Sequence, residues 1–218
     1  MIPSRLITPG VLSLALVALA GCSGSDKDEP DAKGGPASST AAAGQPGGGG
    51  TPIGGASTGV TVSLPAGWKQ VDPTQDASPV VQTSFGLSGP RGELIKKLKE
   101  EQKKLGVVWG IDSSVTSAYA PNVEAGCDRG GIIGTELETL KEKARRLNKG
   151  AKITDLTVSG RPGFKMTNTS TDYDGVTTDQ IEVTVPVSGE RYCFVHLAAG
   201  KGAMPPAAEQ ILSSIRLA

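Results

Sequence analysis

Three cysteines and one histidine are the residues in this 218-residue chain that are best suited to covalent or metal chemistry: Cys22, Cys127, Cys193 and His196. A thiol beside an imidazole can act as a nucleophile, and two thiols can form a disulfide. Clustered cysteines and histidines can bind zinc. The sequence around each of the four residues indicates which of these chemistries it can perform.

An uninterrupted run of small and apolar residues, 11–20, is followed by Gly21 and then by Cys22. With Arg5 upstream, this run has the layout of a secretory signal peptide. Ten residues are too few to cross a bilayer as a helix, which takes about 20. The run is therefore predicted to be a targeting signal and not a membrane span.

The four residues Leu19-Ala20-Gly21-Cys22 resemble the lipobox of bacterial lipoproteins. The resemblance implies that residues 1–21 are a signal peptide and that Cys22 becomes the mature N-terminus. Its sulfur would carry a diacylglycerol, whose two palmitate-type acyl chains anchor the protein at the extracytoplasmic face of the cell membrane. The alternative is an ordinary secretory signal that happens to precede a cysteine.

Residues 22–59 are predicted to form a flexible tether behind the lipidated cysteine. Of the 37 residues after Cys22, 29 are Gly, Ala, Ser, Thr or Pro, and Ile53 is the only large apolar one. Such a segment cannot bury a hydrophobic core. We expect it to be a disordered linker that holds a domain away from the membrane.

Residues 60–218 have the length of one domain and are predicted to form a single one. They include 19 basic and 18 acidic residues, so this domain is close to neutral. Binding of nucleic acid requires a strongly basic face. Nucleic acid is therefore not expected as a partner.

The domain alternates between strand patterns and turn signals. Val60, Val62 and Leu64 alternate with polar residues and are followed by a Pro-Ala-Gly turn. Further strands are predicted at residues 80–87, 107–119, 153–158, 164–171, 176–187 and 191–198, whereas residues 72–79 and 120–134 are expected to be loops. The turns between the last four strands are too short for crossover connections, which predicts an antiparallel meander.

Three amphipathic helices are predicted, at residues 93–105, 135–149 and 205–215. In the first, the apolar stripe consists of Leu94, Ile95, Leu98 and Leu105. The second begins with a capping box formed by Thr135 and Glu138. Antiparallel strands combined with amphipathic helices predict an α+β fold, with a central antiparallel sheet flanked by helices.

Three stretches, VTVSLPAGWKQV, DLTVSGRPGFKMT and EQILSSIRL, occur in the order seen in the PsbP/MOG-type fold. This fold is found in actinobacterial envelope lipoproteins and in plant thylakoids, and the resemblance spans most of residues 60–217. It implies an α/β/α sandwich and an accessory or binding role without a shared active site. A photosynthetic role does not follow from it, because a fold does not determine a function.

Cys127 and Cys193 remain as an even pair once Cys22 is lipidated, which favours a disulfide in an exported chain. The 66-residue separation would stabilise the fold by up to roughly 4 kcal/mol. A packed free cysteine at Cys193 is the alternative. A catalytic thiol at Cys193 is disfavoured because residues three apart on a strand point to opposite faces, whereas Cys127 with His196 stays open.

His196 shares its predicted strand face with Tyr192 and Phe194, which favours a packed or hydrogen-bonded histidine. The residues supply at most three zinc ligands, without Cys-x-x-Cys spacing, so no metal site is assigned. Residues 86–90 (GLSGP) lack the final glycine of a nucleophile elbow and are interpreted as a loop. Asp172, Asp174 and Gly175 suit a hairpin turn better than a calcium loop.

Lysines make the predicted helix 93–105 basic, but an ordinary solvated helix face explains them. Trp68 and Trp109 are interpreted as core residues and not as ligand-stacking groups. No catalytic residue, cofactor or metal site is therefore assigned. The expected function is that of a noncatalytic accessory or binding module whose partner is an envelope protein, lipid or glycan. The alternatives are an envelope hydrolase or transferase with a dispersed active site, and a plain spacer.

Overall fold

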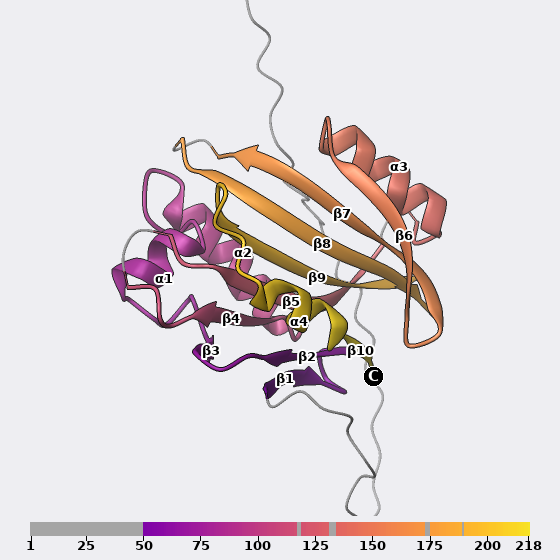
Figure 1. Cartoon of the computed structure of the whole chain (residues 1–218), viewed down its shortest axis with the longest axis horizontal. Helices are drawn as coiled ribbons and strands as arrows, with labels where there is room; N and C mark the ends of the chain where they lie inside the picture. The colour runs from indigo at the N-terminus through magenta and orange to yellow at the C-terminus, as the bar shows by residue number, and fades with distance from the viewer. Residues whose placement is uncertain (1–49, 117–118, 131–133, 173–174, 189) are drawn as a thin grey trace, which may run out of the picture. The chain divides into compact units, whose positions relative to one another are not determined.

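The computed structural model of this chain describes residues 50–116, 119–130, 134–172, 175–188 and 190–218. Their largest element is an antiparallel sheet with the strand order β3-β4-β5-β9-β8-β7-β6 (Figure 1). Its strands are β3 (Trp68–Val71), β4 (Val108–Asp112), β5 (Asn122–Arg129), β6 (Lys152–Val158), β7 (Arg161–Thr171), β8 (Thr177–Val187) and β9 (Arg191–Gly200). A smaller antiparallel sheet has the order β1-β2-β10 and consists of β1 (Thr51–Gly55), β2 (Val60–Leu64) and β10 (Arg216–Leu217).

Helices cover both faces of the seven-stranded sheet. One face, called here the α3 face, carries α1 (Pro79–Ser84), α2 (Gly92–Lys104) and α3 (Leu137–Leu147). The opposite face, called the α4 face, carries α4 (Ala207–Ser213) and the three-stranded sheet (Figure 1). The described part of the chain is therefore an α+β fold with a central antiparallel sheet.

The alternation of side chains along each strand determines which residues meet each layer. On β8, Val183 and Val185 point to the α4 face and pack with Ile211 of α4. On β7, Phe164 and Met166 point to the α3 face and pack with α3. The α4 face thus buries one hydrophobic cluster, and the α3 face buries two, one with α1 and one with α3.

Close approach of the two sheets requires a glycine at position 110 of β4. A Cβ atom at Gly110 would lie 2.8 Å from Cδ2 of Leu64, a β2 residue that is almost completely buried. A larger residue would push β2 away from the seven-stranded sheet, because packed cores tolerate added volume poorly. Gly110 therefore positions the three-stranded sheet on the α4 face.

The predicted fold class is confirmed, as is the antiparallel meander, which is formed by β6, β7, β8 and β9 in sequence order. The helices predicted at 93–105, 135–149 and 205–215 correspond to α2, α3 and α4, with shorter bounds. The strand predicted at residues 107–119 is confirmed only as β4.

The strand predicted at residues 80–87 is wrong, because this segment contains helix α1. Ser78 is extended and Pro79 occupies the first turn, where its fixed φ favours a helix. Val81 and Ser84 are buried three residues apart, which is a helical spacing. A short apolar run does not distinguish a strand from one buried turn of helix.

The tether predicted at residues 22–59 extends too far, because residues 51–55 form β1. Ile53 pairs with Val62 and is only 2% exposed. The backbone hydrogen bonds of the β1–β2 hairpin and this one apolar side chain are enough to order a glycine-rich segment. Residues 22–49 lie outside the described residues.

Strand β5 lies within residues 120–134, which were expected to be a loop. Its sequence contains Asn122, Glu124 and Gly126, residue types that are uncommon in strands. Pairing with β4 on one side and β9 on the other overrides these local preferences. The prediction of a loop is therefore wrong for most of this segment.

The capping box predicted for α3 is also wrong. Glu136 is the N-cap residue and makes no side-chain capping hydrogen bond. Glu138 instead accepts a 2.7 Å hydrogen bond from Lys141, whose ammonium also pairs with Asp155 of β6 at 2.6 Å. These ion pairs hold the first turn of α3 over the edge of the sheet.

Candidate functional site

The two faces of the seven-stranded sheet carry charges of opposite sign. Four acidic residues of the strands point to the α3 face: Glu124, Asp128, Asp155 and Glu182. Five basic residues point to the α4 face: Arg129, Lys152, Arg161, Lys165 and Arg191. The exceptions are Lys69 on the α3 face and Asp112 and Asp179 on the α4 face. The alternation of side chains therefore places most acidic strand residues on the α3 face and most basic strand residues on the α4 face.

A row of polar residues crosses the middle of the α3 face. The strand register places Glu124 of β5 opposite His196 of β9, and His196 opposite Glu182 of β8. Side chains in directly opposite positions on one face have Cβ atoms about 5 Å apart. The register therefore brings one imidazole between two carboxylates, an arrangement called here the acidic row.

Glu124 forms an ion pair with Lys99 of α2, with 2.5 Å between Nζ and Oε2. The side chains of Lys99 and Glu124 are only 13% and 11% exposed. The Lys99 ammonium also lies 5.9 Å from the centre of the Phe85 ring and 5.7 Å from that of Trp109. Both charges are thus removed from water and depend on each other, because an unpaired buried charge is strongly unfavourable.

The charge state of Glu124 follows from these neighbours. Burial by itself raises the pKa of the Glu124 carboxyl. The charge and hydrogen bond of Lys99 outweigh burial, and His196 and Trp109 add to their effect, so the pKa is lowered overall. The buried Trp109 Nε1 completes no hydrogen bond, although it is close enough to affect this pKa. Glu124 is therefore ionised at neutral pH.

Glu182 forms the other end of the acidic row and is half-buried. Its Oε1 accepts a 2.8 Å hydrogen bond from the hydroxyl of Thr184. Tyr192 and Phe194 lie along the same face, with ring centroids 6.5 Å apart. Burial raises the pKa of Tyr192, and the charges of Asp128 and Glu182 raise it further. Within the described residues, neither Asp128 nor Glu182 has an ion-pair partner within 4.0 Å.

The orientation of α2 explains how a lysine comes to lie inside. Ile95, Lys99 and Gln102 have helical spacing and are turned toward the sheet, whereas Leu94 and Leu105 are 43% and 57% exposed. The predicted packing is therefore wrong for Leu94 and Leu105, whereas the other two members of the predicted stripe, Ile95 and Leu98, are partly buried. The sheet below α2 presents the Glu124 carboxylate, which a leucine stripe could not neutralise.

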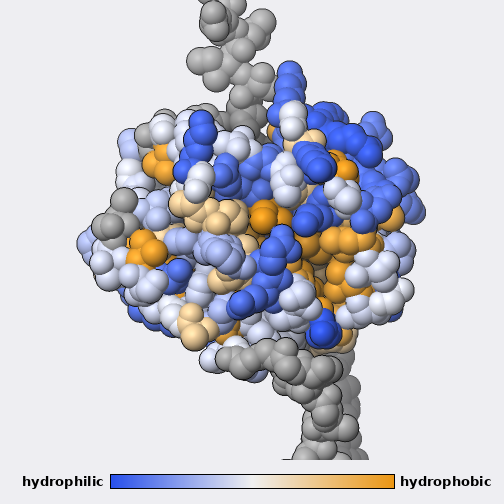
Figure 2. Space-filling view, viewed as in Figure 1, coloured by the Kyte–Doolittle hydropathy of each residue, from blue (hydrophilic) through white to orange (hydrophobic). Residues whose placement is uncertain are grey.

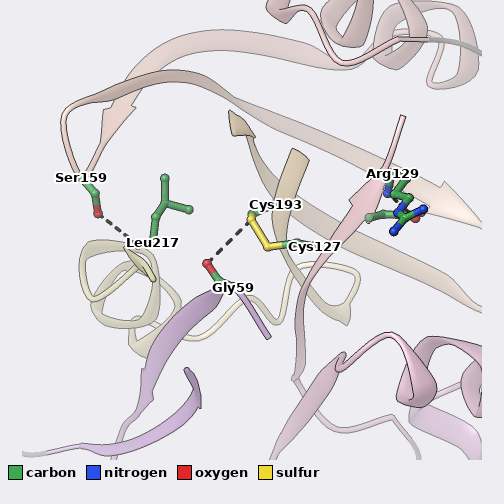
Figure 3. The surroundings of a disulfide bond; sticks show 7 residues. Gly59, Cys127, Arg129, Ser159, Cys193 and Leu217 are labelled. Carbon is green, nitrogen blue, oxygen red and sulfur yellow. Dashed lines mark hydrogen bonds between the residues drawn. A yellow bond between two sulfur atoms is a disulfide. The ribbon is translucent and has the colours of Figure 1, made fainter. Parts of the chain in front are cut away.

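Cys127 and Cys193 form the predicted disulfide on the α4 face (Figure 3). They occupy directly opposite positions on β5 and β9, with Cα atoms 3.9 Å apart, and both are buried. The Gly59 carbonyl oxygen lies 3.8 Å from Sγ of Cys193, and a Cβ atom at Gly59 would lie 2.5 Å from Sγ of Cys127. A catalytic thiol at either cysteine is excluded, because neither is free, and His196 lies on the opposite face of the sheet.

The remaining predicted residues have simple structural roles. Trp68 and Trp109 are buried, as predicted. Ser88 lies in the loop between α1 and α2 and is exposed. Asp172 accepts a hydrogen bond from the Val176 amide in the β7–β8 turn, which agrees with the predicted hairpin. Cys22 and Asp174 lie outside the described residues, and the described residues hold no group of three or more potential ligands placed to bind a metal.

The acidic row itself was not predicted from the sequence. Its members come from separate strands, and the helix that supplies Lys99 is distant from them in the chain. The available signal is on β8, where Gln180, Glu182 and Thr184 alternate with Ile181, Val183 and Val185. An interior strand with one polar face indicates a surface that helices leave uncovered.

No family model matches this sequence, and no curated protein matches it. One similar solved structure is a crystal structure of a protein from Bacteroides thetaiotaomicron VPI-5482, with a TM-score of 0.46 and 10% identity. The match covers 78% of this chain and 48% of that one, so the chain spans about half the length of the Bacteroides protein. Another is the solution structure of cyanobacterial PsbP (CyanoP) from Synechocystis sp. PCC 6803, with a TM-score of 0.45, 13% identity and coverage of 81% and 98%. Because both TM-scores are below 0.5, the fold class is taken from the sheet topology described above.

Proposed function

We propose that this protein is a lipid-anchored, extracytoplasmic binding module of the cell envelope, without catalytic activity of its own. The observation that carries the proposal is the distribution of the cysteines. Cys127 and Cys193 are joined in the described domain, and the third cysteine, Cys22, lies one residue after the apolar run of the signal-like segment. A disulfide indicates an oxidising compartment, such as the outside of the cell. The lipobox-like sequence supports lipidation at Cys22.

A lipid anchor would attach the protein to a membrane without a membrane-spanning helix. None of the described helices is long and apolar enough to cross a membrane. Two acyl chains on one cysteine hold a protein stably at a bilayer, where a single chain gives only marginal binding. The glycine-rich residues before β1 would then separate the domain from the anchor.

The acidic row is the surface that we propose for the binding of a partner. His196 and Glu182 are half-buried, so part of each residue is accessible to solvent on the α3 face. The described thiols are bonded, and His196 faces a carboxylate on each side instead of a nucleophile. This arrangement suits recognition of a ligand that donates hydrogen bonds or carries positive charge.

The anchor is tested by Cys22→Ser in the native host, with Ser25→Ala as a matched control outside the lipobox. We expect Cys22→Ser to appear in the medium or as an unprocessed precursor, whereas Ser25→Ala stays in the membrane fraction. Mass spectrometry of the N-terminal peptide should show a diacylated cysteine only where Cys22 is present. Unchanged membrane retention of Cys22→Ser after washing without detergent would overturn the anchor.

The binding role is tested by crosslinking on intact cells, purification of the anchored protein and mass spectrometry of retained proteins and small molecules. We expect Glu182→Gln to lose a stoichiometric partner that the wild type retains. Glu142→Gln, an exposed change on α3, is the matched control and should retain it. Equal recovery from both variants would contradict a role for the acidic row.

An envelope hydrolase or transferase is the second candidate, because an imidazole between two carboxylates is also suited to proton transfer. The two functions differ in what His196→Ala removes. An enzyme should lose turnover of a substrate while still binding it, whereas a binding module should lose association and have no turnover to lose.

A further inference from the structure

The α4 face is only partly covered by α4 and the three-stranded sheet. Half-buried apolar side chains surround its core near β6, β8 and α4: Leu156, Ile181, Val187, Met204, Leu212 and Leu217. Figure 2, viewed as in Figure 1 with α4 at the front, shows an apolar hollow beside α4 that is bordered by hydrophilic residues. Contiguous apolar surface with a polar rim is typical of an interaction site.

The rim of this apolar surface is basic. Arg161 and Lys165 of β7 and Lys152 of β6 lie on the same face as Leu156. Among the described residues, Lys165 is the only one of these three with an ion-pair partner, Glu209 of α4, and the separation is 3.9 Å. The acidic strand residues of this face, Asp112 and Asp179, lie at one end of the strands. Arg129 and Arg191 lie at the other end, so these carboxylates are too far away to neutralise them. The surface therefore combines apolar side chains with unneutralised positive charge.

Two arginines stand directly opposite each other beside the disulfide. The register pairs Arg129 of β5 with Arg191 of β9, and both are exposed. Like charges in such positions repel each other and destabilise a sheet. Neither arginine has an ion-pair partner within 4.0 Å in the part of the chain that the structure describes. An external anion would relieve this repulsion.

We propose that the α4 face docks on the anionic lipid headgroups of the membrane that holds the anchor. The proposal rests on the proposed function, since the anchor confines the domain to that membrane. Anionic headgroups attract basic residues, and apolar side chains can enter the headgroup boundary. The acidic row lies on the opposite face of the sheet, so docking would turn it toward the medium.

The test uses the mature chain from residue 22 with Cys22→Ser, so that no acyl chain contributes to binding. Its partitioning is measured by sedimentation with phosphatidylcholine vesicles that contain or lack phosphatidylglycerol. We expect binding only to vesicles with phosphatidylglycerol, and weaker binding as salt increases. Each basic residue near such a surface contributes about a fivefold change in partitioning, equivalent to about 1 kcal/mol.

The variant Arg129→Gln with Arg191→Gln should therefore partition roughly 25-fold more weakly. The matched control is Arg145→Gln with Arg146→Gln, which removes the same charge from exposed positions of α3 on the opposite face. The partitioning of this control variant onto the vesicles should fall much less than that of the Arg129 and Arg191 variant. Circular dichroism and thermal unfolding establish that both variants remain folded.

Any of the following results would overturn the docking proposal: no binding to phosphatidylglycerol vesicles by the folded protein, equal losses in the two double variants, or full displacement by soluble glycerol phosphate. The last would indicate a site for a single anion. A concentration-dependent dimer that no longer binds vesicles would identify a second copy as the occupant and also reject the proposal. The protein in the vesicle experiment carries no acyl anchor. A negative result there rejects docking of the α4 face, whereas a negative Cys22→Ser result in cells rejects the anchor, so the two outcomes are distinguishable.

Discussion

The α4 face and the α3 face belong to the same seven strands but differ in the interactions that stabilise them and in the side chains that they present. Beneath the α4 face lies a covalent link, Cys127–Cys193, surrounded by apolar residues. Beneath α2 on the α3 face lies an ion pair, Lys99–Glu124. The difference shows that residue alternation can give the two faces of one sheet strand side chains of different chemistry, basic and apolar on the α4 face, acidic and hydrogen-bonding on the α3 face.

Breaking the buried ion pair should have the largest effect. Lys99→Ala leaves the Glu124 carboxylate buried without its partner, so we expect the free energy of unfolding to fall by about 4 kcal/mol in urea titrations. Lys97→Ala, an exposed change on the same helix, is the control and should alter it by less than about 0.5 kcal/mol. A double variant, Lys99→Met with Glu124→Leu, should recover most of the loss. A loss for Lys99→Ala no larger than the control would show that the pair does not anchor α2.

Removal of the disulfide should have the next largest effect. Cys127→Ala with Cys193→Ala releases a constraint over 66 residues, and we expect a loss of about 3 kcal/mol in the same titrations. The α3 face should be preserved, because the cysteines point away from it. An unchanged urea midpoint would show that the disulfide does not stabilise the fold. If Lys99→Ala no longer lowered the free energy of unfolding in the variant without the disulfide, the two faces would not be independent.

The sequence predicts the α4 face better than the α3 face. Val183 and Val185 alternate with the polar residues Glu182 and Thr184, and two cysteines in an exported chain favour a disulfide. These are local or compositional signals. The charge sorting also follows from alternation, but only once the strands and their faces are known.

The acidic row cannot be derived in the same way, because register creates it. Glu124 lies on β5, a strand whose own residues do not favour a strand, and its position opposite His196 depends on pairing between distant segments. Lys99 is predicted to lie on a helix, but the side of the helix that faces inward depends on the carboxylate below it. Helix α1 and strand β1 are missed for a related reason, since tertiary contacts outweigh weak local preferences.

Acid should weaken the α3 face through protonation of Glu124. The pKa of Glu124 is lowered from its ordinary value of 4.5 in the folded protein. Its ionised form therefore stabilises the fold above about pH 4.5, and this contribution is lost as the pH falls through the lower folded value. Unfolding free energies measured below pH 5 should fall less steeply for Glu124→Gln than for the wild type. Parallel pH profiles would contradict the assigned charge state.

The smallest effect concerns the outward side of α2. Leu105→Gln should change stability by less than about 0.5 kcal/mol, because Leu105 is 57% exposed. Ile95→Ala, on the inward side, should cost about 1 kcal/mol or more. Thermal unfolding of the two variants compares the two sides of one helix. A larger loss for Leu105→Gln would restore the leucine stripe as the packed side.

The central claim is that the two faces of the sheet have different surroundings at the membrane. It is tested most directly with nitroxide labels at Thr154→Cys and Thr157→Cys in the lipidated protein on bilayers that contain phosphatidylglycerol. Both threonines are exposed on β6, but Thr154 lies on the α4 face and Thr157 on the α3 face. The account predicts that a relaxation agent attached to lipid headgroups broadens the spectrum of the label at 154 and leaves the label at 157 nearly unchanged. Equal broadening, or stronger broadening at 157, would contradict it.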